Sequence, residues 1–225
     1  RLKPFTDSHP KALALVNDVP LLERNIKYLQ SFGINEFVIN VHHFGEQIVE
    51  FLEKNNHFGA KIDISDEKDE LLETGGGLLF AQKYLEKEEN FLIMNADILT
   101  DLNIHELVKF HEKHLPLATL AVSDRNSSRK LFFNSEMVLK GWMNKNSGET
   151  KMAESNNDFK ELAFSGIHCI NSSIFDKIKR RGKFSIMEEY LDLMFENNIL
   201  GFQHEARLID VGRPESVIEA EKYFK

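Results

Sequence analysis

The stretch FLIMNADIL, residues Phe91 to Leu99, joins a short apolar run to an acidic residue, and the fold prediction starts from it. Phe91–Met94 has the length and composition of a buried strand. Asp97 follows directly, so we expect it at the carboxyl end of that strand, where open α/β sheets bind ligands. A plainer alternative is a turn or a helix N-cap, a role that Asp101 also satisfies.

Patterns typical of strands and of helices alternate on both sides of this stretch. Such alternation, with helical stretches of about 10–15 residues between strands, indicates βαβ units. We therefore expect an α/β chain: a Rossmann-like three-layer sandwich with a mostly parallel, mixed central sheet. Strands are predicted at 37–41, 61–65, 91–94 and 117–122, and helices over 21–32, around 48–52, over 78–85 and over 104–111.

The pattern changes after residue 123, where short strands surround polar turns and a longer strand is predicted at 164–170. Ser185 and Glu188 have the spacing of a capping box that opens a helix running through Phe195. Pro214 suits the first turn of a last helix. Further strands are predicted at 131–133, 137–142, 151–153, 200–204 and 206–209. No linker or repeat divides the chain, so we expect one domain.

Composition narrows the function classes. The chain has 225 residues, 42% hydrophobic and 28% charged, which excludes disordered, collagen-like and disulfide-scaffold classes. A formal net charge of −8 gives no global reason to bind nucleic acid or an anionic membrane. The single cysteine, Cys169, fits a reducing compartment, and no apolar run approaches the roughly 20 residues of a membrane span. We expect a cytoplasmic protein.

A second aspartate resembles the first in its setting. Asp210, in RLIDVGRPE, ends a predicted strand and precedes a helix, although an N-cap role would explain it as well. Asp97 and Asp210 are 113 residues apart in the sequence, yet two such aspartates can converge on one Mg²⁺. Mg²⁺ usually takes one or two carboxylates together with substrate phosphates.

Glycines and cations supply further candidates for binding phosphate. Three glycines in LLETGGGL, residues 71–78, precede a predicted helix and would let a ligand approach its free N–H groups, a flexible turn being the alternative. Arg1, Lys3 and Lys11 could hold a triphosphate or form a solvated tail. Arg125 and Arg129 flank a serine-rich turn and could contact a phosphate, although a plain surface loop explains them more simply.

The histidines are better explained by structure than by metal binding. His42 and His43 are adjacent on a predicted strand end, so their side chains point to opposite faces. His111 and His114 have helical spacing but no third ligand nearby in the sequence.

Taken together, these pieces resemble the sugar-1-phosphate nucleotidyltransferases. Arg1-Leu2 matches the end of that family's glycine-rich signature, and Pro10-Lys11-Ala12-Leu13 matches its second part. NADIL and IDVGRPE resemble the two metal-aspartate motifs, so the resemblance spans nearly the whole chain. Within the family, ETGGG, NADILTD and FSGIH are most similar to the N-acetylmuramate-1-phosphate uridylyltransferases of peptidoglycan recycling.

The resemblance implies a GT-A-like nucleotidyltransferase fold and a role for each motif. Arg1 and Lys11 would contact the triphosphate, and Asp97 and Asp210 would hold Mg²⁺. The loop Glu73, Thr74, Gly75, Gly76 would border the nucleobase, and Gly166 would lie by the sugar. One difference is that many relatives carry Glu-Lys-Pro before the sugar-glycine strand, where this chain reads NNDFKELAFSG. The resemblance therefore supplies no lysine for the sugar phosphate.

The implied reaction is transfer of UMP from UTP to N-acetylmuramate 1-phosphate, with release of pyrophosphate. Alternatives are a mannose-1-phosphate guanylyltransferase, another pair of nucleotide and sugar phosphate, or a catalytically silent nucleotide-sugar-binding homologue. A Rossmann dehydrogenase is disfavoured because no G-x-G-x-x-G follows a strand. We expect a nucleotide-binding half at about 1–123, a sugar-binding half at about 124–225, and a monomer or weak dimer. A first strand and glycine-rich loop are expected before Arg1.

Overall fold

The computed structural model describes residues 2–68, 70–154 and 158–225. Arg1, a predicted triphosphate contact, lies outside the described residues. The chain forms two compact units, each assembled from separate stretches of sequence. Unit 1 comprises Arg1–Leu71, Asn95–Ile104 and Ala206–Lys225, and unit 2 comprises Leu72–Met94 and His105–Glu205. The expected functional halves at 1–123 and 124–225 stay a prediction.

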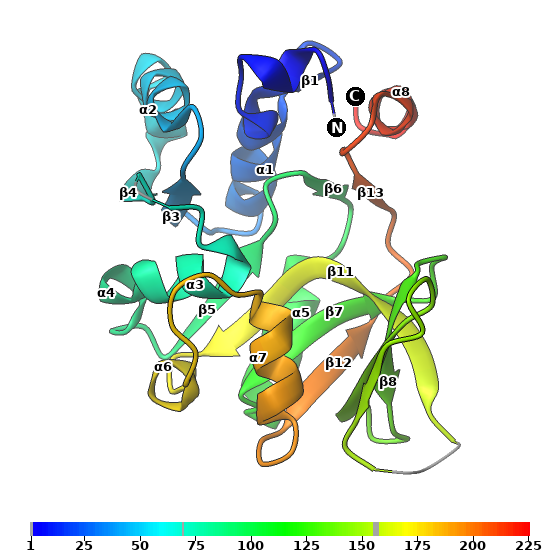
Figure 1. Ribbon diagram of the computed structural model, residues 1–225. Helices are drawn as coiled ribbons and strands as arrows, with labels where there is room; N and C mark the ends of the chain where they lie inside the picture. The colour runs from blue at the N-terminus through cyan, green and yellow to red at the C-terminus, as the bar shows by residue number, and fades with distance from the viewer. Residues whose placement is uncertain (1, 69, 155–157) are drawn as a thin grey trace. The chain divides into compact units, whose positions relative to one another are not determined.

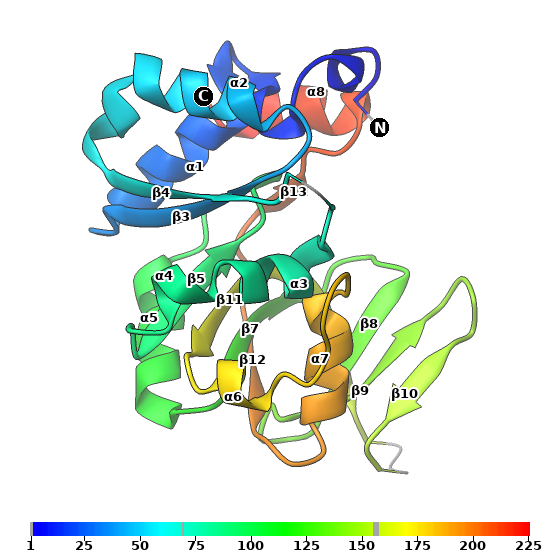
Figure 2. The ribbon, with the colours of Figure 1, turned by 60° about the vertical axis from the view of Figure 1, so that its left-hand side comes forward.

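Unit 1 contains a parallel pair of strands, β3 (Glu36–Val41) and β4 (Lys61–Asp66), joined through helix α2 (Gly45–Lys54) (Figure 2). Helix α1 (Leu21–Gln30) precedes them, and Gly33, at φ +83°, follows its end. This is the βαβ arrangement that the alternating pattern predicts. Its core consists of the buried residues Leu22, Ile26, Val41, Ile48 and Leu52.

The rest of unit 1 joins three segments that are far apart in the sequence. The short hairpin of β1 (Leu15–Val16) and β2 (Val19–Pro20) packs near helix α8 (Pro214–Tyr223) (Figure 1). Strand β6 (Ile98–Thr100) pairs antiparallel with β13 (Leu208–Asp210). Pro214 occupies the first turn of α8, as predicted. The buried residues shared by these segments are Leu2, Ala14, Val16, Leu21, Leu99, Ile209, Val211 and Ala220.

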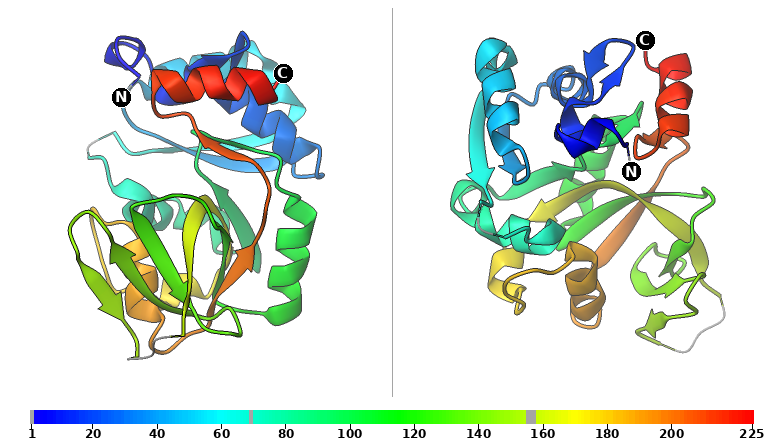
Figure 3. Two further views of the ribbon diagram at one scale, coloured as in Figure 1. Left: turned by 90° about the vertical axis from the view of Figure 1, so that its right-hand side faces the viewer. Right: turned by 45° about the horizontal axis from the view of Figure 1, so that its top comes forward.

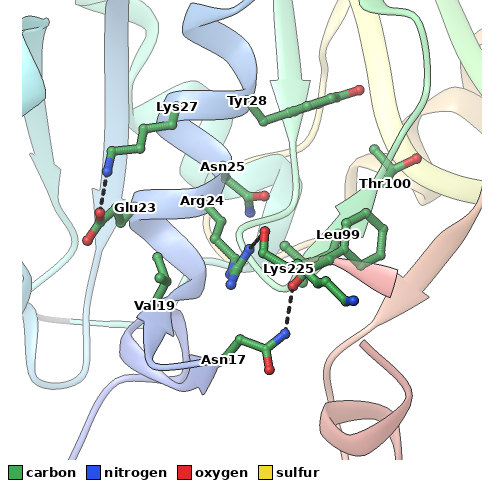
Figure 4. Close-up of a pocket in the computed structure, with 11 residues that line it drawn as sticks. Asn17, Val19, Glu23, Arg24, Asn25, Lys27, Tyr28, Leu99, Thr100 and Lys225 are labelled. Carbon is green, nitrogen blue, oxygen red and sulfur yellow. Dashed lines mark hydrogen bonds and ion pairs between the residues drawn. The ribbon is translucent and has the colours of Figure 1, made fainter. Parts of the chain in front are cut away.

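A cavity of about 460 Å³ lies in unit 1, lined by α1, β6 and the end of the chain (Figure 4). Arg24 donates from Nη2 to the carbonyl of Val16 at 2.7 Å, and Asn17 donates from Nδ2 to the carbonyl of Phe224 at 3.0 Å. These bonds tie the hairpin to α1 and to the segment after α8, so the polar lining is already used in holding unit 1 together.

Unit 2 is built on a seven-stranded sheet with the order β10-β9-β8-β11-β7-β12, in which β5 also pairs with β11. The long strand β11 is buried along most of its length and has β7 on one edge. The strands are β5 (Asn90–Met94), β7 (Ala118–Ser123), β8 (Arg129–Phe133), β9 (Leu139–Asn144), β10 (Thr150–Met152), β11 (Lys160–Asn171) and β12 (Ile199–Gln203).

The predicted α/β class with a mixed sheet is confirmed, but the balance of strand directions differs. Among the described strands of this sheet, β7 and β12 form the parallel pair, and the other ladders are antiparallel. The prediction of a mostly parallel sheet does not take the position of strand β11 into account. Strand β11 lies between β5 and β7, which run in the same direction, so each ladder of β11 is antiparallel. Alternation along the sequence does not reveal such an insertion.

Helices cover both faces of this sheet, so the predicted three-layer arrangement is present within unit 2 (Figure 3). Ala118, Leu120 and Val122 of β7 belong to one hydrophobic cluster with residues of α3, α6 and α7. Thr119 of the same strand instead faces α5, where it is hydrogen-bonded to His111. Alternate residues of a strand point to opposite faces, which accounts for the division. The helices are α3 (Glu73–Phe80), α4 (Gln82–Leu85), α5 (Ile104–His114), α6 (Ile174–Lys177) and α7 (Ile186–Leu193).

Helix boundaries follow local signals at some ends and not at others. Ser185 is the N-cap of α7, as predicted, but its Oγ accepts from the backbone N–H of Met187 and not from that of Glu188, as the predicted capping box requires. The helix ends at Leu193 instead of Phe195. Helix α3 begins at Glu73, five residues before the predicted start, so the three glycines lie inside it. Of the described helices, none is long and apolar enough to cross a bilayer.

Two buried histidines of unit 2 are structural. His111 Nδ1 lies 2.9 Å from Thr119 Oγ1, and its Nε2 lies 3.0 Å from Asn90 Oδ1, which joins α5 to β7 and β5. His168 Nδ1 lies 2.7 Å from the hydroxyl of Tyr190. Burial lowers the pKa of His111 to about 4 and that of His168 to about 3. Both rings are therefore neutral in the folded chain at neutral pH.

These pKa values predict that the free energy of unfolding falls with acidification. The unfolded histidines take up protons near pH 6.5 while the folded ones do not, so the unfolded state binds more protons below that pH. Each histidine should lower the free energy of unfolding by roughly 1 kcal/mol between pH 7.5 and 5.5. Urea unfolding at the two pH values measures the loss.

His111→Gln should remove about half of the pH dependence that His111 and His168 contribute together, because one of these two rings is gone. His114→Gln, at the exposed end of α5, is the control and should keep the wild-type pH dependence. Equal pH dependence in His111→Gln and the wild type would contradict the assignment.

Candidate active site

The side chain of Lys11 joins the two predicted metal aspartates in unit 1. Lys11 opens a short 3₁₀ turn after Pro10, and its Nζ donates to Oδ2 of Asp97. The same Nζ lies 3.5 Å from Oδ1 of Asp210. The side chains of Lys11 and Asp97 are about one-third exposed, and that of Asp210 is 60% exposed. The group is thus reachable from solvent.

Backbone pairing brings the two aspartates together. In the ladder between β6 and β13, Asp210 is directly opposite Ile98, the residue after Asp97. The N–H of Val211 also donates to the carbonyl of Asp97 at 2.8 Å. On the other side, Asn25 of α1 donates from its amide to the carbonyl of Ala96 at 3.0 Å. Both carboxylates are therefore positioned by the register of strands and not by flexible loops.

Gly212 leaves room for this group. A Cβ at position 212 would lie 2.9 Å from Oδ1 of Asp210 and 3.3 Å from Nζ of Lys11. The first distance is shorter than ordinary van der Waals contact, so a side chain here would displace the carboxylate. Glycine thus keeps the space between strand β13 and helix α8 open at the point where the charges meet.

The residues around Lys11 fit a divalent cation of the magnesium type. Two carboxylates close to one positive group offer hard oxygen donors, which Mg²⁺ prefers. Among the described residues, there is no group of three or more His, Cys, Asp or Glu side chains arranged to hold a metal. An ion held by the two carboxylates alone would need substrate phosphates and water as its other ligands. The predicted convergence of Asp97 and Asp210 is present, and the metal itself stays a prediction.

The predicted nucleotide loop lies in unit 2 and uses its glycines for packing. The N–H groups of Gly75 and Gly76 donate to the carbonyl of Phe184, at 2.9 and 3.3 Å. The expectation of free N–H groups at this helix start is therefore wrong for these two residues. A Cβ on Gly75 would lie 2.3 Å from the ring of Phe184, so the close approach serves the chain itself.

Glu73 and Thr74 remain at the surface of the same turn. Glu73 adopts φ +60°, and its carboxylate lies 3.9 Å from Nζ of Lys183. Thr74 accepts a hydrogen bond on Oγ1 from the N–H of Ile186 at 3.0 Å. These contacts give the turn a fixed shape, and the proposed role of residues 73–76 beside a nucleobase stays a prediction.

The predicted sugar glycine, Gly166, is the centre of a bulge in β11. Its φ of +74° is a conformation that glycine adopts without strain. Between the pairs Phe164↔Val122 and His168↔Leu120 the register shifts, so β11 carries extra residues relative to β7. Bulges of this kind occur beside active sites, where they redirect the chain.

Three polar residues near this bulge were assigned no firm role by the sequence. The hydroxyl of Ser165 is hydrogen-bonded to Nε2 of His204 at 2.9 Å, and both residues are buried. Lys130 is only 7% exposed and donates from Nζ to the carbonyl of Arg125 at 2.9 Å. In the sequence, Lys130 stands beside Arg129 and before the apolar run Leu131–Phe133, so it resembles any surface lysine.

The other candidate residues have structural positions. His42 Nδ1 lies 2.6 Å from the carbonyl of Glu67. Burial raises the pKa of the Cys169 thiol to about 12, so it is a thiol and not a nucleophile at neutral pH. Lys3 pairs with Asp7 at 3.1 Å on the surface.

Comparison with known proteins decides the family. The sequence profile of the nucleotidyl transferase family matches residues 1–225. The chain belongs to this family. The predicted resemblance to sugar-1-phosphate nucleotidyltransferases is therefore confirmed at the family level.

The names of curated relatives are more specific than the name of the family. The chain is 28% identical to the mannose-1-phosphate guanyltransferase of Gibberella zeae and 24% identical to the mannose-1-phosphate guanylyltransferase catalytic subunit beta of Xenopus tropicalis. Each alignment covers 97% of this chain and 59% of the relative, so the chain spans about three-fifths of their length. These names differ from the uridylyltransferase that the motifs favour.

Solved structures of other proteins share the fold. HddC from Yersinia pseudotuberculosis is 22% identical, with a TM-score of 0.82 over 100% of this chain and 94% of that one. A putative glucose-1-phosphate thymidylyltransferase from Bacillus anthracis is 17% identical, with a TM-score of 0.81 over 98% and 89%. At these identities the comparison concerns the fold alone, and it agrees with the predicted α/β class.

The position of Lys11 predicts competition between its ammonium and a divalent cation. Lys11→Met should raise the affinity of the nucleotide-free protein for Mn²⁺ about tenfold, because two carboxylates lose their counter-charge in a partly exposed setting. Electron paramagnetic resonance of free Mn²⁺ measures this affinity. Lys3→Met, which removes a more exposed cation of unit 1 that pairs with Asp7, should leave it unchanged. Weaker Mn²⁺ binding in Lys11→Met would contradict the shared site.

The packing of Gly75 predicts that Gly75→Ala destabilises the protein. Alanine in place of a helical glycine normally stabilises by about 0.5–1 kcal/mol, but here the new methyl meets the buried Phe184 ring. We expect a net loss of about 1–3 kcal/mol in urea unfolding. Gly148→Ala, where a Cβ meets nothing within 4 Å, should show only the roughly 1 kcal/mol cost of φ +73°. A stabilised Gly75→Ala would show that the helix can move away.

Proposed function

We propose that this protein transfers a nucleotidyl group from a nucleoside triphosphate to a sugar 1-phosphate and releases pyrophosphate. The observation that carries the proposal is the Lys11 ammonium held between the carboxylates of Asp97 and Asp210. A cation and two hard oxygen ligands at one place suit the handling of polyphosphate, where charge must be neutralised from both sides. Membership of the nucleotidyl transferase family supports the same reaction class.

The reaction needs no general base from the protein. The second pKa of a phosphate monoester is about 6, so a sugar 1-phosphate is largely a dianion at neutral pH. One of its oxygens attacks the α-phosphorus of the triphosphate in line. As that bond forms, the bond from the α-phosphorus to the bridging oxygen breaks, and the electron pair leaves with pyrophosphate. The barrier comes from bringing two polyanions together and stabilising the leaving charge.

The residues of unit 1 meet these needs by charge. We assign Lys11 to the leaving pyrophosphate, whose developing charge its ammonium would neutralise. Asp97 and Asp210 would hold Mg²⁺, which when bound reduces the negative charge of phosphate oxygens. Arg1 has the same proposed role as Lys11 and lies outside the described residues.

The residues of unit 2 would select the two substrates. We assign the turn of Glu73, Thr74, Gly75 and Gly76 to the nucleobase, where a backbone fixed by Phe184 would present a rigid edge. Gly166 is assigned to the sugar, because it lies at the bulge of β11 and carries no side chain, although the residue itself is buried. A preformed backbone surface of this kind lowers the ordering cost of binding.

Two observations favour different substrates. Curated relatives at 24–28% identity are named mannose-1-phosphate guanyltransferases, which supports GTP and mannose 1-phosphate. The motifs ETGGG, NADILTD and FSGIH favour UTP and N-acetylmuramate 1-phosphate. We place the guanylyl pair first, since those alignments extend over 97% of the chain while the motifs are short.

A substrate panel tests the proposal. The protein is incubated with Mg²⁺, one of the four common nucleoside triphosphates, and mannose, glucose or N-acetylmuramate 1-phosphate, and pyrophosphate release is measured. One pair should exceed the others by at least about tenfold in kcat/KM. Absence of pyrophosphate with every pair would favour a silent nucleotide-sugar-binding homologue.

Neutralising either aspartate should abolish most of the turnover with the fold intact. Asp97→Asn and Asp210→Asn keep the side-chain shape but remove the charge shared with Lys11, and we expect losses of at least about 100-fold in kcat. Asp18→Asn, on an exposed turn of unit 1, is the matched control and should retain activity. Thermal unfolding verifies the fold of each variant. Near-normal turnover in both site variants would remove the metal assignment.

A further inference from the structure

The sugar phosphate needs a cation that the family resemblance does not supply. Many relatives carry a Glu-Lys-Pro motif before the sugar-glycine strand, and this chain has NNDFKELAFSG there. A sugar 1-phosphate carries close to two negative charges at neutral pH, and burying part of that charge without a counter-charge is costly. If the proposed function holds, a basic residue near Gly166 would supply this counter-charge.

Within unit 2, the loop after β7 brings an arginine to the bulge of Gly166. Arg125 follows the carboxyl end of β7, and its Nη2 donates to the carbonyl of Phe164 at 2.8 Å, two residues before Gly166. Val122 of β7 is paired with Phe164 of β11 at the start of the same register shift. Arg125 and Gly166 therefore belong to one sheet edge, the carboxyl end of β7, where α/β sheets bind ligands.

A buried lysine fixes the backbone of this arginine. Lys130, 7% exposed, donates from Nζ to the carbonyl of Arg125 at 2.9 Å, and its Nζ lies 3.9 Å from Oδ1 of Asp124. Burying an ammonium costs several kcal/mol of lost hydration, which an apolar side chain at this position would not incur. What the lysine adds is a defined position for residues 124–125.

The bulge is held from its other side as well. Ser165 is hydrogen-bonded to His204, which follows β12, and the N–H of His204 donates to the carbonyl of Val122 at 3.0 Å. The two residues before Gly166 are thus each tied to a neighbouring segment, Phe164 to Arg125 and Ser165 to His204. A bulge fixed by such contacts presents a preorganised surface.

We propose that Arg125 binds the phosphate of the sugar 1-phosphate beside Gly166, and that Lys130 is the positioning residue that holds Arg125 in place. This rests on the proposed function. A guanidinium has five N–H donors in a planar fork, so it can keep its bond to Phe164 and still donate to phosphate oxygens. Its charge replaces the one that Glu-Lys-Pro would provide.

Substrate-specific affinity separates this role from a structural one. Arg125→Gln should raise KM for the sugar 1-phosphate at least tenfold and leave KM for the nucleoside triphosphate within twofold. Arg125→Lys should recover part of the loss, and Lys130→Met should show a smaller rise in the same KM. Lys113→Gln, which removes a charge from the exposed side of α5 in unit 2, should match the wild type.

Direct binding keeps the test independent of turnover. Mannose 1-phosphate, N-acetylmuramate 1-phosphate and inorganic phosphate are titrated into wild type and Arg125→Gln by calorimetry, with thermal unfolding of each variant as the check on folding. Binding that weakens in Arg125→Gln while no substrate pair releases pyrophosphate would support Arg125 and refute the proposed reaction. Normal turnover with an unchanged sugar-phosphate KM in Arg125→Gln would overturn the inference and leave the reaction standing. An equal loss for the triphosphate, or no binding of any of the three by wild type, would also overturn it.

Discussion

One ammonium group between two carboxylates organises unit 1. The carboxylates of Asp97 and Asp210 would repel each other at close range without a counter-charge. The ammonium of Lys11, which lies close to both, supplies that positive charge. The rest of the local structure serves this arrangement. The ladder of β6 and β13 sets the register, and Gly212 leaves the volume empty. An exchange of Lys11 for a divalent cation and phosphate would preserve the charge balance.

A comparable constraint organises unit 2 around strand β11. Its insertion between β5 and β7 turns the sheet mixed, and its bulge at Gly166 lies at the carboxyl end of β7. The loop after β7 then returns to the bulge through Arg125. Topology thus gathers residues from three strands at one sheet edge. The polar groups there are fixed by neighbours, which is what a binding surface for a charged substrate requires.

Local signals made parts of the fold predictable. The strands at 37–41, 61–65 and 91–94 and the helix at Pro214 follow from periodicity and from turn and capping residues, because these depend on a few neighbours in the chain. The glycine run shows the limit. Its composition correctly marks a close backbone approach, but the group that approaches is the 182–186 segment, more than a hundred residues away. No local pattern identifies that partner.

The sequence by itself determined the family, the α/β class and which acidic and basic residues are candidates for the site. These features can be read from the sequence because the motifs at strand ends are short and continuous. Only the tertiary structure decided which of them meet. Lys11 with two aspartates, and Arg125 with the bulge of Gly166, are contacts between residues dozens of positions apart. The buried Lys130 has no distinguishing spacing at all. Such contacts depend on strand order and register, which pairing across the whole sheet fixes and one-dimensional spacing does not.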